Sequence, residues 1–314
     1  MWKIVTDEEL IRLSKSEHPV LRASALRVML DRKSFNHFDV VMNHLDDTAI
    51  VAYDVGEFGV SWRMISDDLL KKYRWESSQS LNKTIELVLT KYNYLRSAYT
   101  ILLEIAPQEK YYSLIKEMAT RPRRLSYDGY EMGFDDIEYA LYGLAKFRKK
   151  EDVKIIKEKF LKNYYRMSFV SFRLMKEFPD TAYTDVFKKY HRLRFYRFSG
   201  DDKDGFTGND DNRASSTDFI TALAAQNSPS SAELFDTLLN RIPKFTCNLN
   251  IGWVEDHALM EIWNTKDPVY EKLRNKISFR ARKYLKFQEK FRDAFKDIQP
   301  YNPSIDTTGE HIRW

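Results

Sequence analysis

The stretch Ala98–Ala119, AYTILLEIAPQEKYYSLIKEMA, holds the pattern that decides the fold. Its first part is rich in apolar residues, and Pro107 then interrupts it. Proline lacks the N–H that a helix interior needs, but its fixed φ suits the first turn of the next helix. In the second part, Tyr111, Ile115 and Met118 recur at helical spacing and form one stripe. The stretch therefore predicts two helices joined by a short turn.

The same helix, turn and helix pattern recurs along the chain. The turns are marked by Asp31, Pro107, Lys149, Pro179, Pro229 and Pro268. Their spacing averages about 40 residues when the first gap is counted as two units. One hairpin cannot bury its apolar stripe alone, so neighbouring hairpins must stack and share a core. We therefore expect an all-α solenoid of about six to seven hairpins, whose first helix is capped by Thr6 and Glu9 at capping-box spacing.

The run HPVLRASALRVML, residues 18–30, carries a family resemblance. Pro19, Leu21, Arg22 and Ala25 resemble the P-x-V-R-x-x-A pattern of HEAT repeats. The resemblance implies that the proline opens a helix, that the aliphatic residue and alanine pack between layers, and that the arginine bonds to a neighbouring unit. The later hairpins resemble divergent bacterial HEAT-like repeats in shape and period, without the arginine signature. The resemblance implies a binding scaffold and supplies no catalytic residues.

The pattern predicts one repeat domain over residues 1–296 and an irregular tail at 297–314. Residues 49–61 mix β-branched residues with glycine, which predicts either a distorted unit or an inserted loop. Residues 199–216, SGDDKDGFTGNDDNRASS, form an acidic loop. Part of this loop resembles a calcium-binding EF-hand loop, but glycine stands at its first ligand position and aspartate at the position of the bidentate glutamate. A flexible, solvated loop is the favoured interpretation.

Composition argues against several classes of protein. The chain is 43% hydrophobic and 14% aromatic, which suffices for a continuous core. Cys247 is its only cysteine, so it has no intramolecular disulfide and no cysteine-based zinc site. Without a signal-like N-terminus or an 18-residue apolar run, we expect a cytoplasmic protein with no membrane contact. No common nucleotide, acyl-transfer or zinc-protease motif occurs, so we expect neither an enzyme nor a cofactor.

The histidines and their acidic neighbours are the remaining candidates for chemistry. His37 and His44 lie two turns apart on one predicted helix, about 10 Å along its axis. That separation is too large for one metal ion unless other segments supply ligands. Glu255, Asp256 and His257 are adjacent in sequence and would point in different directions on a helix. We therefore predict no metal site and no catalytic residue.

The positive charge is concentrated in two blocks. Residues 141–200 contain 16 Lys and Arg against 6 Asp and Glu, and residues 268–296 contain 10 against 3. The family resemblance implies that second helices line a concave surface, where these cations and nearby tyrosines would form a groove. A solvated lysine-rich face explains the same charge pattern. The predicted groove consists of Lys150, Lys154, Lys157, Lys188, Lys189, Arg192, Arg194, Tyr164, Tyr165 and Tyr196.

Two functions follow from this pattern as hypotheses. The first is a non-catalytic HEAT-like scaffold or adaptor that binds a protein partner, for instance an acidic one, through the concave, basic and aromatic groove. The alternative is a nucleic-acid-binding repeat protein that grips the phosphate backbone with residues 141–200 and 268–296, in which case binding would weaken steeply with salt. The identity of the partner and the oligomeric state stay open at this point.

Overall fold

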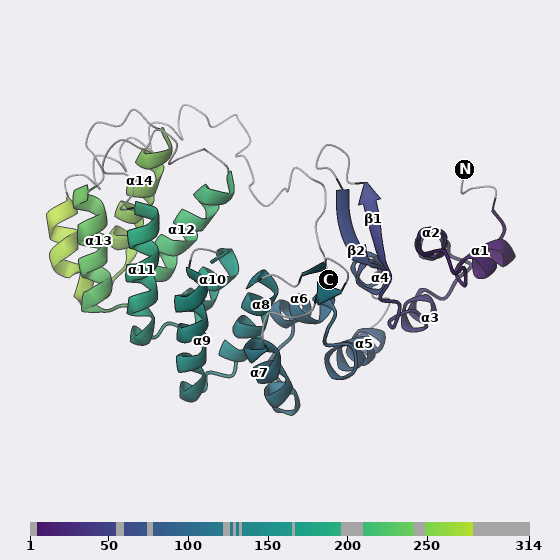
Figure 1. Cartoon of the computed structure of the whole chain (residues 1–314). Coiled ribbons are helices and arrows are strands. Elements are labelled where there is room, and N and C mark those ends of the chain that lie inside the picture. Colours follow the sequence, from purple (N-terminus) through teal and green to yellow (C-terminus); the bar gives the residue numbers. More distant parts are fainter. Residues whose placement is uncertain are drawn as a thin grey trace. The chain divides into compact units, whose positions relative to one another are not determined.

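The computed structural model describes residues 5–54, 60–73, 78–121, 126–127, 130–131, 134–164, 167–195, 210–241 and 249–278. Helices dominate this part of the chain, which confirms the predicted all-α class (Figure 1). Its strands are confined to two short hairpins. No helix in the described ranges has the length and apolar character needed to span a bilayer. The chain divides into two compact units between Gly143 and Leu144.

Unit 1 begins with a helix whose predicted cap is confirmed. The Thr6 hydroxyl accepts the Glu9 N–H, and the Glu9 carboxylate accepts the Thr6 N–H. The elements of unit 1 are α1 (Asp7–Leu13), α2 (Pro19–Met29), α3 (His37–Met42), β1 (Ile50–Asp54), β2 (Val60–Met64), α4 (Ile65–Lys72), α5 (Ser78–Thr90), α6 (Arg96–Glu104), the 3-10 helix η2 (Glu109–Tyr111), α7 (Tyr112–Thr120), β3 (Ser126–Tyr127), β4 (Tyr130–Glu131) and most of α8 (Phe134–Ala145).

The irregular insert expected at residues 49–61 contains β1 and the start of β2. The two strands pair antiparallel, with Ile50 opposite Met64 at one end of the ladder. Their β-branched residues favour extended backbone, and pairing satisfies the N–H and C=O groups that a loop would leave to water. Val51 and Met64 are buried, whereas Trp62 is 60% exposed. The hairpin therefore contributes buried side chains to the core of unit 1.

Charged contacts join successive elements of unit 1. The Arg22 guanidinium donates to both oxygens of Asp47, at 2.5 and 3.0 Å. Asp67 on α4 accepts the N–H of Ser97 at 2.8 Å and that of Arg96 at 3.1 Å, and so caps α6 from outside. Burial raises the pKa of Asp67, an effect that the Ser97 hydrogen bonds oppose. The Arg96 side chain in turn forms an ion pair with Asp136 on α8, at 2.9 Å.

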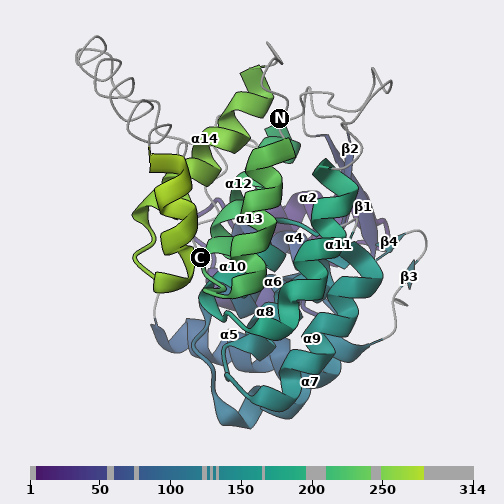
Figure 2. The same cartoon turned by 90° about the vertical axis from the view of Figure 1, so that its left-hand side faces the viewer.

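Unit 2 contains two rows of helices. In one row α10 packs against α12 and α12 against α14; in the other α9 packs against α11 and α11 against α13. Figure 2 shows α9, α11 and α13 side by side. The elements are α9 (Lys150–Asn163), α10 (Phe169–Glu177), the 3-10 helix η4 (Thr181–Tyr183), α11 (Thr184–Phe195), α12 (Asp210–Ala224), α13 (Pro229–Arg241), α14 (Leu249–Asn264), the 3-10 helix η5 (Pro268–Tyr270) and a final helical segment at 271–278.

An aromatic cluster lies at the centre of unit 2. The Phe219 ring on α12 stacks on Tyr190 with ring centroids 5.2 Å apart. Phe172 and Phe187 meet the same ring edge-on, at 5.8 and 5.7 Å. All four residues are at most 1% exposed. Aromatic packing thus joins α10, α11 and α12 in unit 2. In unit 1, by contrast, arginine–aspartate contacts join successive elements.

Unit 2 repeats one pair of turns. We call residues 144–195 its first half and residues 210–278 its second half. The α8–α9 turn contains Arg148 with a φ of 54°, and the α12–α13 turn contains Asn227 with a φ of 44°. The next turn in each half is a 3-10 helix that begins at an aspartate cap and ends at a buried tyrosine. The matched pairs are Arg148 and Asn227, Asp152 and Ser231, Ile156 and Phe235, Asp180 and Asp267, and Tyr183 and Tyr270.

Candidate functional site

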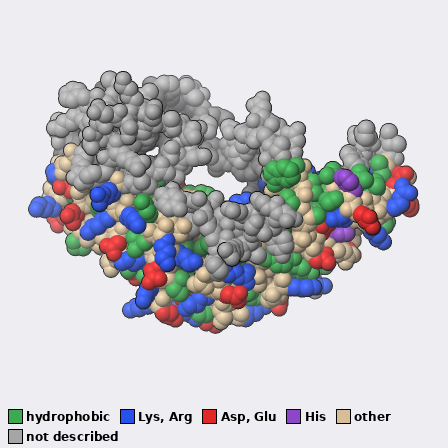
Figure 3. Space-filling model, in the orientation of Figure 1, with side chains coloured by type: hydrophobic (Ala, Val, Ile, Leu, Met, Phe, Trp, Pro, Cys, Tyr) green, Lys and Arg blue, Asp and Glu red, His purple; other side chains and the backbone are tan. Residues whose placement is uncertain are grey.

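Four cations predicted to line a groove are exposed on two adjacent helices. Lys150 and Lys154 lie on α9, and Lys188 and Arg192 lie on α11. We call these four residues the cationic face. Within the described residues none of them forms an ion pair. Figure 3 shows Lys and Arg side chains over the region of α9 and α11, interspersed with acidic side chains.

Two other lysines of the predicted groove have partners inside the chain. Lys157 on α9 forms an ion pair with Asp185 on α11 at 2.6 Å. Lys189 donates to the Leu161 carbonyl oxygen at 2.9 Å, and its ammonium lies 4.3 Å from the centroid of the Tyr164 ring. These contacts fasten α11 to α9. Their charges are therefore less available to a ligand than those of the cationic face.

Several sequence predictions fall on residues that the structure does not describe. Outside the description lie Tyr165, Tyr196 and Cys247, the side chains of Arg194, Glu255 and Asp256, and all of residues 196–209 and 279–314. Residues 210–216, which we expected in the acidic loop, form the first turns of α12. The placement of the groove on a concave surface stays a prediction.

The histidines are engaged in ordinary structural contacts. His37 Nε2 lies 2.9 Å from the Arg32 carbonyl oxygen, and His257 Nε2 lies 3.0 Å from the Thr221 hydroxyl. Burial is the largest cause of a lowered pKa for both His44 and His257, which favours neutral imidazoles at neutral pH. In the part of the chain that the structure describes, no group of three His, Cys, Asp or Glu side chains is placed to hold a metal ion.

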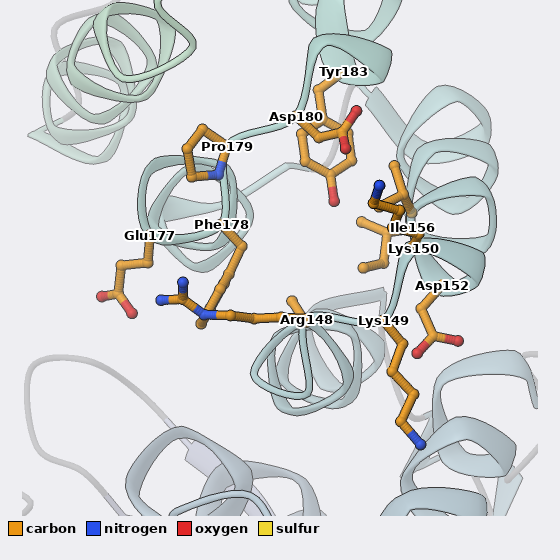
Figure 4. Close-up of a pocket in the computed structure, with 12 residues that line it drawn as sticks. Arg148, Lys149, Lys150, Asp152, Ile156, Glu177, Phe178, Pro179, Asp180 and Tyr183 are labelled. Atoms are coloured by element: carbon orange, nitrogen blue, oxygen red, sulfur yellow. The ribbon is translucent and has the colours of Figure 1, made fainter.

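A cavity that the sequence did not reveal lies between the α8–α9 turn and the α10–α11 turn. Its volume is about 340 Å³. Figure 4 shows Phe178 and Ile156 on opposite sides of this space, with Lys149 pointing away from it. Lys150 lines it, which connects the cavity to the cationic face. The only signal in the sequence is the consecutive cations at Arg148, Lys149 and Lys150, which occupy a turn.

Arg148 occupies a backbone conformation that glycine or asparagine normally adopts. Its φ of 54° places it in the left-handed region, just after the end of α8. Its N–H donates to the Ala145 carbonyl oxygen at 2.9 Å, so it closes the helix. The guanidinium lies 5.4 Å from the centroid of the Phe178 ring. In Figure 4 the arginine side chain runs past Phe178, with its guanidinium on the Glu177 side of that ring.

Tyr183 points its hydroxyl into the cavity (Figure 4). The residue is only 1% exposed, and within the described residues its hydroxyl makes no hydrogen bond. Burial, with a contribution from the Asp180 carboxylate, raises the pKa of Tyr183. The phenol therefore stays protonated at neutral pH and offers a hydrogen-bond donor to whatever fills the cavity.

The carboxylates around the cavity are largely occupied. Glu177 forms an ion pair with Arg173 at 2.8 Å. Asp180 accepts the Ala182 N–H at 2.8 Å and so begins the 3-10 helix η4. Asp152 is buried. By contrast, Arg148 and Lys150 form no ion pair within the described residues, so their positive charges are available to a ligand.

Comparison with known proteins adds no relative to this description. The chain matches no protein-family model, and no curated protein or solved structure gives a significant match.

Proposed function

We propose that this chain is a non-catalytic scaffold of HEAT-like hairpins stacked as an α-solenoid, and that it binds a protein partner. The observation that carries the proposal is the cationic face: four cations without ion-pair partners in the described residues, on two helices that Lys157 and Lys189 fasten together. A rigid surface with unpaired charge suits recognition of a complementary acidic surface, because charge complementarity speeds encounter and suppresses wrong partners.

The contacts of Arg22 support the HEAT-like part of the proposal. The resemblance implies that this arginine bonds to a neighbouring unit, and Arg22 bonds to Asp47, 25 residues further on and shortly after α3. It also donates to the Ser16 carbonyl oxygen at 2.5 Å, in the turn before α2. The ordered packing of α9, α11 and α13 in unit 2 agrees with stacked hairpins.

A protein partner is favoured over nucleic acid by what the neighbouring lysines do. Phosphate binding gains strength from many cations that release counterions together. In the predicted groove, Lys157 and Lys189 are already bonded to Asp185 and Leu161. The cavity beside the cationic face also has an apolar wall, which suits a protein side chain.

The test is capture of a partner by the full chain from nuclease-treated lysate, with two charge-reversed variants. Lys154→Glu/Lys188→Glu reverses two charges of the cationic face, whereas Lys33→Glu/Lys266→Glu makes the same change of net charge at exposed lysines elsewhere. We expect the native chain and the control to recover one partner in stoichiometric amount, and the first variant to bind it about tenfold more weakly or worse.

Two results would overturn the proposal. One is capture that is equally strong with both variants, since the cationic face would then play no part. The other is an absence of any stoichiometric partner combined with salt-sensitive binding of a short DNA duplex that Lys154→Glu/Lys188→Glu abolishes. That second result would establish the nucleic-acid alternative.

A further inference from the structure

The tyrosines at the matched turns of unit 2 have different surroundings. In the second half, the Tyr270 hydroxyl lies 2.5 Å from the Ser231 hydroxyl, 3.1 Å from the Ala224 carbonyl oxygen and 3.3 Å from that of Leu223. In the first half, Tyr183 is equally buried, but its hydroxyl makes no hydrogen bond within the described residues. In the first half, the tyrosine hydroxyl therefore has no hydrogen-bond partner in the described part of the chain.

Two sequence differences between the halves accompany this change. Ser231, the partner of Tyr270, corresponds to Asp152 in the first half. Ser228, whose hydroxyl accepts the Ser231 N–H at 3.1 Å, corresponds to Lys149, which gives α9 no side-chain cap. The second half thus closes its turn with two hydroxyls, and the first half carries charged side chains at the same positions.

Hydrogen-bond donors border the open turn. The Tyr183 hydroxyl points into the cavity, and Arg148 and Lys150 also line it. Three carboxylates line it as well: Glu177 and Asp180 are bonded to Arg173 and to the Ala182 N–H, and Asp152 is buried. Such a set of donors suits a carboxylate, because hydrogen bonds between ionised groups are roughly twice as strong as neutral ones.

The cavity also has a hydrophobic side and a limited size. Phe178, Ile156 and Pro179 line it, and its volume of about 340 Å³ lies at the small end of the range for ligand sites. A space of this kind accommodates one apolar side chain together with an adjacent carboxylate. The Arg148 guanidinium contacts the Phe178 ring, so apolar surface and positive charge are side by side.

We propose that this cavity binds an acidic segment of a protein partner, in which an apolar residue stands next to a glutamate or aspartate. The apolar side chain packs against Phe178, and the carboxylate accepts hydrogen bonds from Tyr183 and from Arg148 or Lys150. The inference rests on the proposed scaffold function and deepens it, because it gives the chemistry of the segment that the scaffold recognises.

The test uses a dipeptide probe and the full chain. The probe is N-acetyl-phenylalanyl-glutamyl amide, and the matched control is the glutaminyl compound, which differs only in the charged group. Binding is followed by NMR through the Ile156 methyl groups, which line the cavity. We expect a saturable shift of the Ile156 signals with the acidic probe, and affinity about tenfold weaker for the neutral one.

Matched variants separate the cavity from general effects of charge. Tyr183→Phe removes only the hydroxyl and should weaken the acidic probe about fivefold. Lys150→Gln should weaken it as well, whereas Tyr270→Phe should leave its affinity unchanged. Equal affinity for the two probes, no shift of Ile156 at the highest probe concentration, or unaltered binding by Tyr183→Phe would each overturn the inference.

The same variants distinguish failure of this inference from failure of the scaffold proposal. If native chain and Tyr183→Phe/Lys150→Gln capture a partner equally well, the cavity inference is wrong and the scaffold proposal stands. If the acidic probe binds at Ile156 but the native chain captures no partner, the scaffold proposal is wrong and the cavity remains an acidic-ligand site.

Discussion

The two halves of unit 2 have matched turns, but the tyrosine that ends the second turn has different hydrogen bonds in each half. Arg148 and Asn227 both hold the left-handed conformation at the first turn, and Tyr183 and Tyr270 both end the second. In the second half the tyrosine hydroxyl is bonded to Ser231 and to carbonyl oxygens. In the first half the tyrosine hydroxyl faces a cavity. A few polar differences at matched positions therefore accompany the change from a turn closed by hydrogen bonds to a turn that borders a cavity.

The Gln226 side chain makes hydrogen bonds across the junction between the halves. The Gln226 amide donates to the Met175 carbonyl oxygen at 2.8 Å and to that of Ala222 at 3.0 Å. Its oxygen accepts the Asp180 N–H at 3.2 Å. The second half thus anchors the turn that ends in Tyr183.

The largest expected effect concerns the matched core positions Phe235 and Ile156. Phe235 is completely buried and meets the Tyr270 ring edge-on at 5.9 Å. We expect Phe235→Ala to lower the free energy of unfolding by about 3–5 kcal/mol. Ile156→Ala should lower it by only about 2 kcal/mol, because Ile156 already borders an open space. Urea unfolding measures both, and a larger loss for Ile156→Ala would contradict the contrast between closed and open turns.

Removal of the Gln226 side chain should have the next largest effect. Gln226→Ala leaves the Asp180 N–H and two carbonyl oxygens without their partner, so we expect a loss of about 2 kcal/mol in unfolding free energy. Hydrogen exchange at the Asp180 amide should accelerate. The exposed Gln108→Ala in unit 1 serves as control. Unchanged exchange at Asp180 would show that the second half does not anchor this turn.

Acid should destabilise the second half through His257 on α14. His257 corresponds to Val170, because the matched aspartates and tyrosines are both 87 residues apart. Burial lowers the pKa of His257 below its ordinary 6.5. The unfolded chain therefore binds a proton more readily, and stability is lost as the pH falls below 6.5 toward the folded-state pKa.

Unfolding free energies at pH 7.5 and 5.5, for native chain and His257→Gln, measure this effect. Hydrogen exchange, corrected for its intrinsic pH dependence, should report the loss in α12 and α14, which the His257 contact with Thr221 joins. An acid-induced loss of equal size in His257→Gln would exclude His257 as its cause.

The smallest expected change in stability is at Arg148. Arg148→Gly relieves the left-handed strain but loses the contact with Phe178, so we expect the two effects to cancel to within about 0.5 kcal/mol. Affinity for the acidic dipeptide should nevertheless fall. Asn227→Gly, at the matched turn, should change neither quantity by much. A marked loss of stability in Arg148→Gly would show that the arginine is kept for packing.

The sequence predicts what is local and fails where distant residues meet. The helical class, the Thr6–Glu9 cap and the start of a helix at Pro229 follow from spacing and from the chemistry of single residues. The hairpin of β1 and β2 could not be predicted, since a strand is defined by its partner. The pattern of β-branched residues at 49–61 signals only that the helix is interrupted.

The candidate site shows the same limit. Helical spacing correctly placed Lys150 and Lys154 on an exposed face, because that depends on one helix. It could not show that Lys157 meets Asp185, 28 residues away on the next helix. The cavity could not be predicted from the sequence for the same reason, since it forms only where the turn at Arg148 meets the turn at Tyr183.

The central claim is that the Tyr183 turn is open while the Tyr270 turn is closed, and the most direct measurement compares Tyr183→Phe with Tyr270→Phe in urea unfolding. Loss of the Tyr270 hydroxyl removes its hydrogen bonds with Ser231 and the Ala224 carbonyl oxygen, so we predict a decrease of about 1 kcal/mol in unfolding free energy. For Tyr183→Phe we predict no decrease. A decrease for Tyr183→Phe as large as that for Tyr270→Phe would contradict the account, because it would show that the Tyr183 hydroxyl is bonded within the chain.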